Sequence, residues 1–178
     1  MSDEMSNDQV LEMLEGRLYG KYRGIVQSNE DPTGRGRLQV SVPAVLGSRP
    51  VWAMPCVPYA GQGVGLFALP PVGAGVWVEF EAGDPSYPIW VGCFWAQGEI
   101  EQVDAQPMVK FWKTDHASIR IDDNDGTIEI ANSAGSLLRI TATDIVLEST
   151  EIDCKAGTKK TALTPIHFDV HDGAFTVV

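Results

Sequence analysis

The sequence predicts an all-β protein with a small barrel near its N-terminus and a series of short strands after it. The 18 glycines and 11 prolines interrupt the chain too often for long helices to form. Apolar residues also alternate with polar ones over many short runs, which is the period of a strand. Only residues 3–16 have helical spacing, with a stop signal at Gly16. We therefore expect a short N-terminal helix or, more simply, a flexible arm over residues 1–16, followed by strands.

The first domain is expected over residues 17–96. Apolar runs bounded by Gly or Pro occur at residues 18–28, 36–42, 51–60, 63–69, 74–83 and 88–95. Five or six short strands with such frequent turns are typical of a small antiparallel barrel or sandwich, and a segment of this length suits an OB-type barrel. Between the last two strands, Pro85 and Pro88 remove ladder donors, so that segment is expected to be a turn or an edge.

An ordered set of residues within this domain resembles a known family. The set comprises Gly24-Ile25-Val26, Asp31-Pro32, Gly36-Arg37-Leu38-Gln39-Val40, Pro70-Pro71-Val72-Gly73, residues 78–85 and Pro88-Ile89-Trp90-Val91-Gly92. It is similar to the OB domain of contractile-tail spikes, which include phage baseplate assembly protein V, lysozyme-bearing tail spikes and the type VI secretion spike. The resemblance implies an OB-fold barrel followed by a needle, an intertwined trimeric β-helix.

Charge argues against the nucleic-acid binding that OB barrels often perform. The net charge is −11, and residues 1–15, 16–96 and 97–178 contribute −5, +1 and −7. Binding to single strands requires a basic groove with exposed aromatic rings. The aromatic residues here alternate with apolar neighbours and are expected in the core or a subunit interface: Trp77, Phe80, Trp90, Phe94 and Trp95.

Other compositional features exclude several further classes of protein. The three cysteines, Cys56, Cys93 and Cys154, are far apart and odd in number, so we expect buried apolar thiols and neither a disulfide framework nor a CxxC metal site. No apolar run reaches the length that spans a bilayer. The start of the chain has no basic or apolar signal region, which predicts synthesis in the cytoplasm.

A polar linker over residues 97–107 leads to a second domain, residues 108–178, with a degenerate repeat. Apolar pairs recur every seven to ten residues, separated by turns too short to hold a covering helix. Such strands would leave their apolar side chains in water unless they faced other copies of the chain. Three chains around one axis meet this need, and a monomeric sandwich would require a second apolar sheet face. The expected axial residues are Ile119, Ile121, Ile128, Ile130, Leu138, Ile140, Ile145, Leu147, Ile152 and Cys154.

The C-terminal segment contains the one constellation that resembles a site. In an extended strand, His167, Asp169 and His171 share one face, and three copies facing the axis would supply enough ligands for one iron or zinc. Some needles of the family close with a metal on a His-x-His motif, from which this spacing departs. The simpler interpretation places both histidines outside an apolar axis of Ile166, Phe168 and Val170, with no cofactor. The last residues, Phe175, Val177 and Val178, would gather as an apolar platform for a small tip protein.

Together these features predict a structural protein: the central spike of a contractile injection system, such as a phage tail, a tailocin or an extracellular injection particle. The resemblance implies a homotrimer that contacts the baseplate hub and inner tube proteins and pierces the target cell envelope. No nucleophile elbow or phosphate loop is present, so no enzymatic activity is expected. The alternatives are an OB-type module that binds polysaccharide or nucleic acid, and a small metalloenzyme using His167 and His171.

Overall fold

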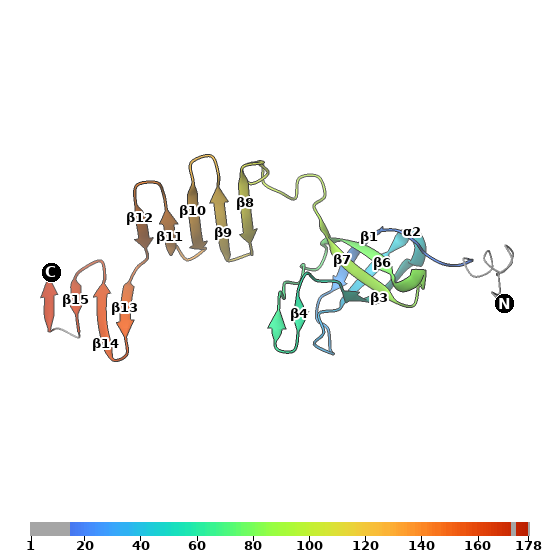
Figure 1. The fold of residues 1–178 in the computed structure, drawn as a ribbon, viewed down its shortest axis with the longest axis horizontal. Helices are drawn as coiled ribbons and strands as arrows, with labels where there is room; N and C mark the ends of the chain where they lie inside the picture. Colours follow the sequence, from blue (N-terminus) through green and yellow to red (C-terminus); the bar gives the residue numbers. More distant parts are fainter. Residues whose placement is uncertain (1–14, 172–173, 178) are drawn as a thin grey trace, which may run out of the picture. The chain divides into compact units, whose positions relative to one another are not determined.

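The computed structural model describes residues 15–171 and 174–177 (Figure 1). The chain divides into two compact units, of which the first ends at Glu99 and the second begins at Ile100. Apart from Glu15 and Gly16, the arm or helix expected over residues 1–16 falls outside the described residues. Among the residues described, no helix has the length and apolar character needed to cross a bilayer.

The first unit is built around a closed five-stranded barrel. Its strands are β1 (Tyr22–Ser28), β2 (Leu38–Val42), β3 (Gly47–Pro55), β6 (Gly75–Phe80) and β7 (Pro88–Phe94), in the order β1-β2-β3-β7-β6. The barrel closes because β6 also pairs with β1. All pairs are antiparallel except β3 and β7, which run parallel with Met54 opposite Ile89. This is the five-stranded barrel of an OB fold, so the expected fold class of this unit is confirmed.

Alternation along the strands builds the barrel core. In β6, Val76, Val78 and Phe80 are buried while the residues between them are only half-buried, as the two-residue period of a strand requires. The inward side chains of all five strands form one cluster: Val26, Leu38, Val40, Val42, Ala53, Val76, Val78, Phe80 and Trp90. The indole Nε1 of Trp90 donates to the carbonyl of Gly36 at 3.2 Å, which satisfies the polar atom of this buried ring.

Two segments of the barrel differ from expectation. A four-residue helix, α2 (Pro43–Leu46), follows β2. It was not predicted because one turn is too short to show a helical period. The run at residues 63–69 is not a barrel strand. Only β5 (Val64–Gly65) forms there, as a short hairpin with β4 (Ala60–Gly61), because Gly61, Gly63 and Gly65 weaken an extended strand.

The loop between β1 and β2 is held by one carboxylate. Asp31 accepts hydrogen bonds from the backbone N–H groups of Thr33, Arg35 and Arg37, and from Arg37 Nε and Nη2 at 3.0 and 2.8 Å. Its side chain is almost fully buried. The Arg37 guanidinium, which is the main cause, and these N–H donors hold the pKa of Asp31 well below its usual range. The guanidinium also lies over the Trp52 ring, 5.0 Å from its centroid.

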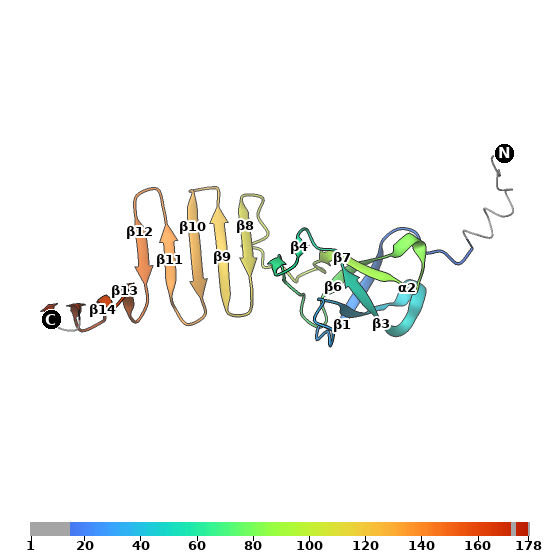
Figure 2. The same cartoon turned by 60° about the horizontal axis from the view of Figure 1, so that its bottom comes forward.

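The second unit consists of two antiparallel meanders, seen from a second direction in Figure 2. The first sheet contains β8 (Val109–Lys113), β9 (Ala117–Asp122), β10 (Thr127–Asn132), β11 (Leu137–Ile140) and β12 (Ile145–Glu148), each hydrogen-bonded to the next. The second contains β13 (Ile152–Ala156), β14 (Lys159–Leu163), β15 (Phe168–Val170) and β16 (Phe175–Val177). The five alternating runs that the sequence indicates correspond to β9 to β13.

The prediction of buried cysteines is wrong for the single chain. Cys56, Cys93 and Cys154 are all exposed. Cys56 follows the end of β3, and Cys93 lies near the end of β7, opposite Val76. Partial burial nevertheless raises the pKa of the Cys93 thiol.

Truncation of Leu38 should test the assignment of the barrel core. Leu38 is fully buried, and Leu38→Ala is expected to lower the free energy of unfolding by about 2–5 kcal/mol because it leaves a cavity. Denaturant unfolding followed by tryptophan fluorescence measures the change. Leu66 is exposed, so Leu66→Ala is the matched control and should change stability by less than about 0.5 kcal/mol. Equal effects of the two substitutions would contradict the core assignment.

Asp31 should make the barrel sensitive to acid. Because folding lowers its pKa, its stabilising contribution is fully present above the unfolded value of about 3.9 and is lost as the pH falls toward the folded value. We expect Asp31→Asn to melt at a lower temperature than wild type at pH 7. We also expect a shallower fall in its melting temperature between about pH 5 and pH 2. Glu30 is exposed, so Glu30→Gln should retain the wild-type profile. An unchanged acid profile in Asp31→Asn would refute this role.

Candidate functional site

One face of the first sheet in the second unit is a continuous apolar surface. Residues directly opposite one another on neighbouring strands are apolar on this face, as with Ile119 and Ile130 or Ile128 and Ile140. Two rows run across the sheet. The first is Trp112, Ile119, Ile130, Leu138 and Leu147, and the second is Ile121, Ile128, Ile140 and Ile145, with Lys110 at its β8 end.

On β9, β10 and β12, apolar side chains of this face are more exposed than several polar residues of the opposite face. Ile130 is 46% exposed and Ile145 70% exposed, whereas Ser118, Arg120 and Glu129 on the opposite face are half-buried. A sheet that is half-buried within its own chain normally shows the reverse pattern. Rows of exposed Ile and Leu of this extent indicate an interaction surface.

The second sheet continues this pattern. Ile152 lies opposite Leu163, which lies opposite Phe168, which lies opposite Val177. A parallel row contains Cys154, Thr161, Val170 and Phe175. We call the residues of the four rows on the two sheets the apolar face. All the axial residues expected from the sequence are on it, and the structure adds Trp112 and Leu163, which the sequence analysis missed. Both residues lie in strands, β8 and β14, where apolar and polar residues also alternate. These strands lack the Ile-x-Ile pattern by which the other strands were recognised.

The opposite face of the first sheet carries a charged, internally paired row together with apolar residues such as Phe111, Leu137 and Val146. Arg120, Glu129 and Arg139 lie in register across β9, β10 and β11, and Arg139 Nη1 is 3.8 Å from Glu129 Oε1. Arg120 Nη2 also donates to Asp122 at 2.9 Å. Oppositely charged cross-strand pairs stabilise a sheet modestly. The charged row makes this face more compatible with water than the apolar face, which has no such row.

On the second sheet, the corresponding polar face carries its own ion pairs. Lys160 Nζ lies 2.8 Å from Asp153 Oδ1 and 3.0 Å from Glu151 Oε1. The Lys160 ammonium, and after it that of Lys155, lowers the pKa of Asp153 to about 2. The polar side of the strands is thus charged at neutral pH.

Part of the segment expected as a linker is attached to the first sheet. Lys113 Nζ lies 3.2 Å from Asp104 Oδ2 and 3.4 Å from Glu101 Oε1, and Arg120 Nε lies 3.8 Å from Asp104 Oδ1. The two carboxylates raise the pKa of Lys113. Residues 101–104 therefore cover part of the charged face and leave the apolar face open.

The two histidines near the C-terminus do not share an extended strand in the single chain. β15 contains only residues 168–170, and His171 has a left-handed φ of 53°, because the chain turns there. His167 Nδ1 lies 3.1 Å from Thr164 Oγ1, and His171 Nε2 lies 2.7 Å from Lys159 Nζ. Among the described residues, no group of three or more His, Cys, Asp or Glu side chains is placed to hold a metal. A metal site shared by three chains stays a prediction.

The tip residues are only partly described. Phe175 is 59% exposed and Val177 is 52% exposed, both on the apolar face, while Val178 lies outside the described residues. Ile166, assigned in the simpler interpretation to the axis with Phe168 and Val170, lies before β15 and is exposed. An apolar platform at the tip stays a prediction.

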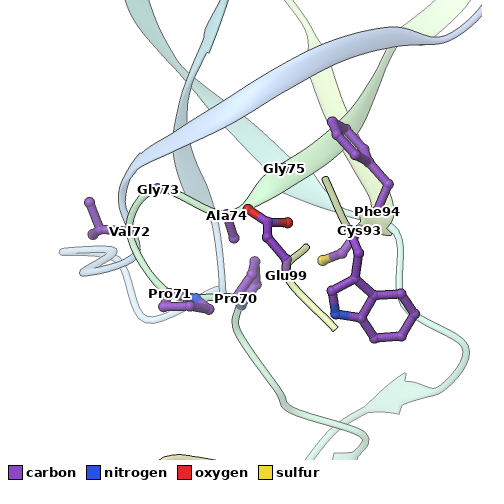
Figure 3. Close-up of a pocket in the computed structure, with 10 residues that line it drawn as sticks. Pro70, Pro71, Val72, Gly73, Ala74, Gly75, Cys93, Phe94 and Glu99 are labelled. Carbon is purple, nitrogen blue, oxygen red and sulfur yellow. The ribbon is translucent and has the colours of Figure 1, made fainter. Parts of the chain in front are cut away.

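The barrel carries a hollow between the turn that precedes β6 and the end of β7 (Figure 3). The Pro70–Gly75 turn forms one side, and Cys93, Phe94 and Trp95 form another, around a cavity of about 550 Å³. Glu99 extends into it, with its Oε2 accepting from the backbone N–H of Ala96 at 2.5 Å. Gly75 is required here, because a Cβ atom would lie 2.6 Å from the Phe94 ring. The hollow is apolar, with a single carboxylate.

Comparisons with known proteins identify the barrel. The family described as the type VI secretion system/phage-baseplate injector OB domain matches residues 22–95, which begin at β1 and end one residue after β7. No curated protein matches the chain. The matched segment contains all five barrel strands, the Asp31 loop and the Pro70–Gly75 turn. The barrel is therefore similar to the injector OB domains of type VI secretion systems and phage baseplates.

Proposed function

We propose that the protein is the trimeric central spike of a contractile injection system, with the barrel attached to the baseplate and the second unit forming the needle. The family of the barrel supports a structural role in a baseplate and is not an enzyme family. The finer assignment of a piercing needle depends on one observation, the apolar face. Two sheets that expose rows of apolar side chains on one side need an apolar partner surface of the same length to bury them.

A second and a third copy of the chain would provide that partner surface. Each copy would bring the same rows in the same register, so Ile would meet Ile and Leu at every level of the sheet. Burial of such side chains contributes about 1.5–3 kcal/mol each, so an apolar face of this extent would hold the assembly firmly. The charged face of each sheet would then form the outside and keep the needle soluble.

The remaining partners follow from this arrangement. The barrel, as a baseplate domain, would contact the hub and the inner tube proteins. The apolar residues at the end of the second sheet, Phe175 and Val177 with Val178 after them, would present a threefold platform to a small tip protein. The needle would contact the target envelope only when the sheath contracts, as a component of a virion or injection particle.

The first prediction from this proposal concerns mass. Native mass spectrometry or light scattering should give about 58 kDa, three times the 19.3 kDa of one chain. Because interchain strands separate slowly, the trimer band should also survive SDS at room temperature and disappear on boiling. A monomer at micromolar concentration would contradict the proposal and favour a binding module.

A charge on the apolar face should prevent assembly. Ile130→Asp would bring three carboxylates together in an apolar interior, at a cost of several kcal/mol per trimer, so light scattering should show loss of the trimer. Ser118→Asp is the matched control, because Ser118 is on the opposite face beside Lys113, and it should remain trimeric. A trimer of Ile130→Asp with unchanged melting would refute the axial assignment.

A further inference from the structure

A second hollow on the barrel has the features of a ligand site. It lies between the β1–β2 loop and the β6–β7 loop, over β3 and β7, with a cavity of about 340 Å³. We call it the loop hollow, and its main lining residues are Arg35, Arg37, Trp52, Met54, Glu81 and Tyr87. OB barrels bind oligonucleotides and oligosaccharides on the face between their first loop and the loop joining their fourth and fifth strands. The loop hollow occupies this position, since β6 and β7 are the fourth and fifth barrel strands in chain order.

Both loops are fixed by their own hydrogen bonds. Asp31 holds the β1–β2 loop as described above. In the β6–β7 loop, Asp84 Oδ1 accepts from the Ser86 N–H at 2.9 Å, and the Asp84 carbonyl accepts from the Tyr87 N–H at 3.0 Å. The Glu81 N–H donates in turn to the Tyr87 carbonyl at 3.0 Å. A site that is already formed binds its ligand at a smaller entropic cost.

The hollow combines an aromatic surface with balanced polar groups. Tyr87 is 61% exposed and offers an open ring, and Met54 and Ile89 form an apolar floor. Arg35 is exposed and uses its Nε to donate to Thr33 Oγ1 at 3.2 Å, which leaves other N–H donors of the guanidinium for a ligand. Glu81 and Ser86 are exposed and supply acceptors. Arg37 adds no net charge, because Asp31 neutralises it.

The near-zero net charge of the loop hollow favours one of the two ligand classes of OB barrels, sugars, over the other, nucleic acids. A nucleic acid would require several unpaired cations along a groove, and the loop hollow offers Arg35 opposed by Glu81. A neutral sugar presents hydroxyl groups to donors and acceptors and apolar C–H faces to an aromatic ring. We propose that the loop hollow binds a short neutral oligosaccharide, stacked on Tyr87 and hydrogen-bonded by Arg35, Glu81 and Ser86. The proposal depends on the barrel alone and does not require the trimer.

Sugar binding by the full-length protein tests the proposal. Saturation-transfer NMR and calorimetry would be run with two probes at millimolar concentration, the tetrasaccharide of β-1,4-linked N-acetylglucosamine and maltotetraose. At least one should bind, and Tyr87→Ala and Arg35→Ala should each weaken its binding at least about tenfold. Tyr87→Phe should retain most of the affinity, since it keeps the ring. The matched controls, Tyr59→Ala and Arg49→Ala, replace exposed residues of the same types outside the hollow and should bind as wild type does.

Three outcomes would overturn the proposal. The first is that neither sugar binds to the wild-type protein. The second is that binding is unaffected by Tyr87→Ala and Arg35→Ala, which would place the sugar elsewhere. The third is that a thymidine oligonucleotide binds through the same residues and displaces the sugar. Circular dichroism and native mass of each variant confirm that a loss of binding reflects the hollow and not the fold.

Discussion

The two-residue period of the strands is the constraint on which the second unit depends. In an antiparallel meander, directly opposed residues point to the same side, so a strand that alternates apolar and polar residues fixes the chemistry of both faces of the whole sheet. Here each successive hairpin keeps that register, from Ile119 and Ile130 to Leu138 and Leu147. The result is a sheet with one apolar face and one mixed face that carries a charged, internally paired row. The strands therefore specify the chemistry of their partner as well as their own pairing.

The two units differ in how far a single chain buries their apolar side chains. The barrel curves its sheet until β6 meets β1, so its Val, Leu and Trp side chains contact one another inside a single chain. The sheets of the second unit stay open and have no covering helix among the residues described. One unit thus buries its apolar side chains within a single chain, whereas the other leaves a row of them exposed. This division is the basis of the proposal that the barrel serves as a baseplate domain and the second unit as an assembly domain.

Sequence reasoning succeeded where a short-range pattern determines structure. The alternation around Val76, Val78 and Phe80 predicts β6, and the Ile-x-Ile pairs predict β9 and β10. The failures have physical causes of a different kind. The one-turn helix after Pro43 has no period to detect, and the glycines near Val64 leave a hairpin where an apolar run predicted a barrel strand. The exposed Cys93 and the turn at His171 depend on the pairing partners of their strands, which composition does not reveal. The loop hollow was missed because its two sides lie about 50 residues apart in the sequence and meet only through the parallel contact of β3 and β7.

The meander also bears on how the length of such a protein can change. Each strand of the first sheet pairs only with its neighbours in the sequence, so no distant segment is threaded between them. Removing or duplicating one hairpin would shorten or lengthen that sheet by two strand spacings, about 10 Å. All the remaining strands would keep their apolar residues on the same face. The barrel allows no such change, because its closure fixes the number of strands. Length is therefore the property that evolution can adjust in this unit by whole hairpins, with the barrel left unchanged.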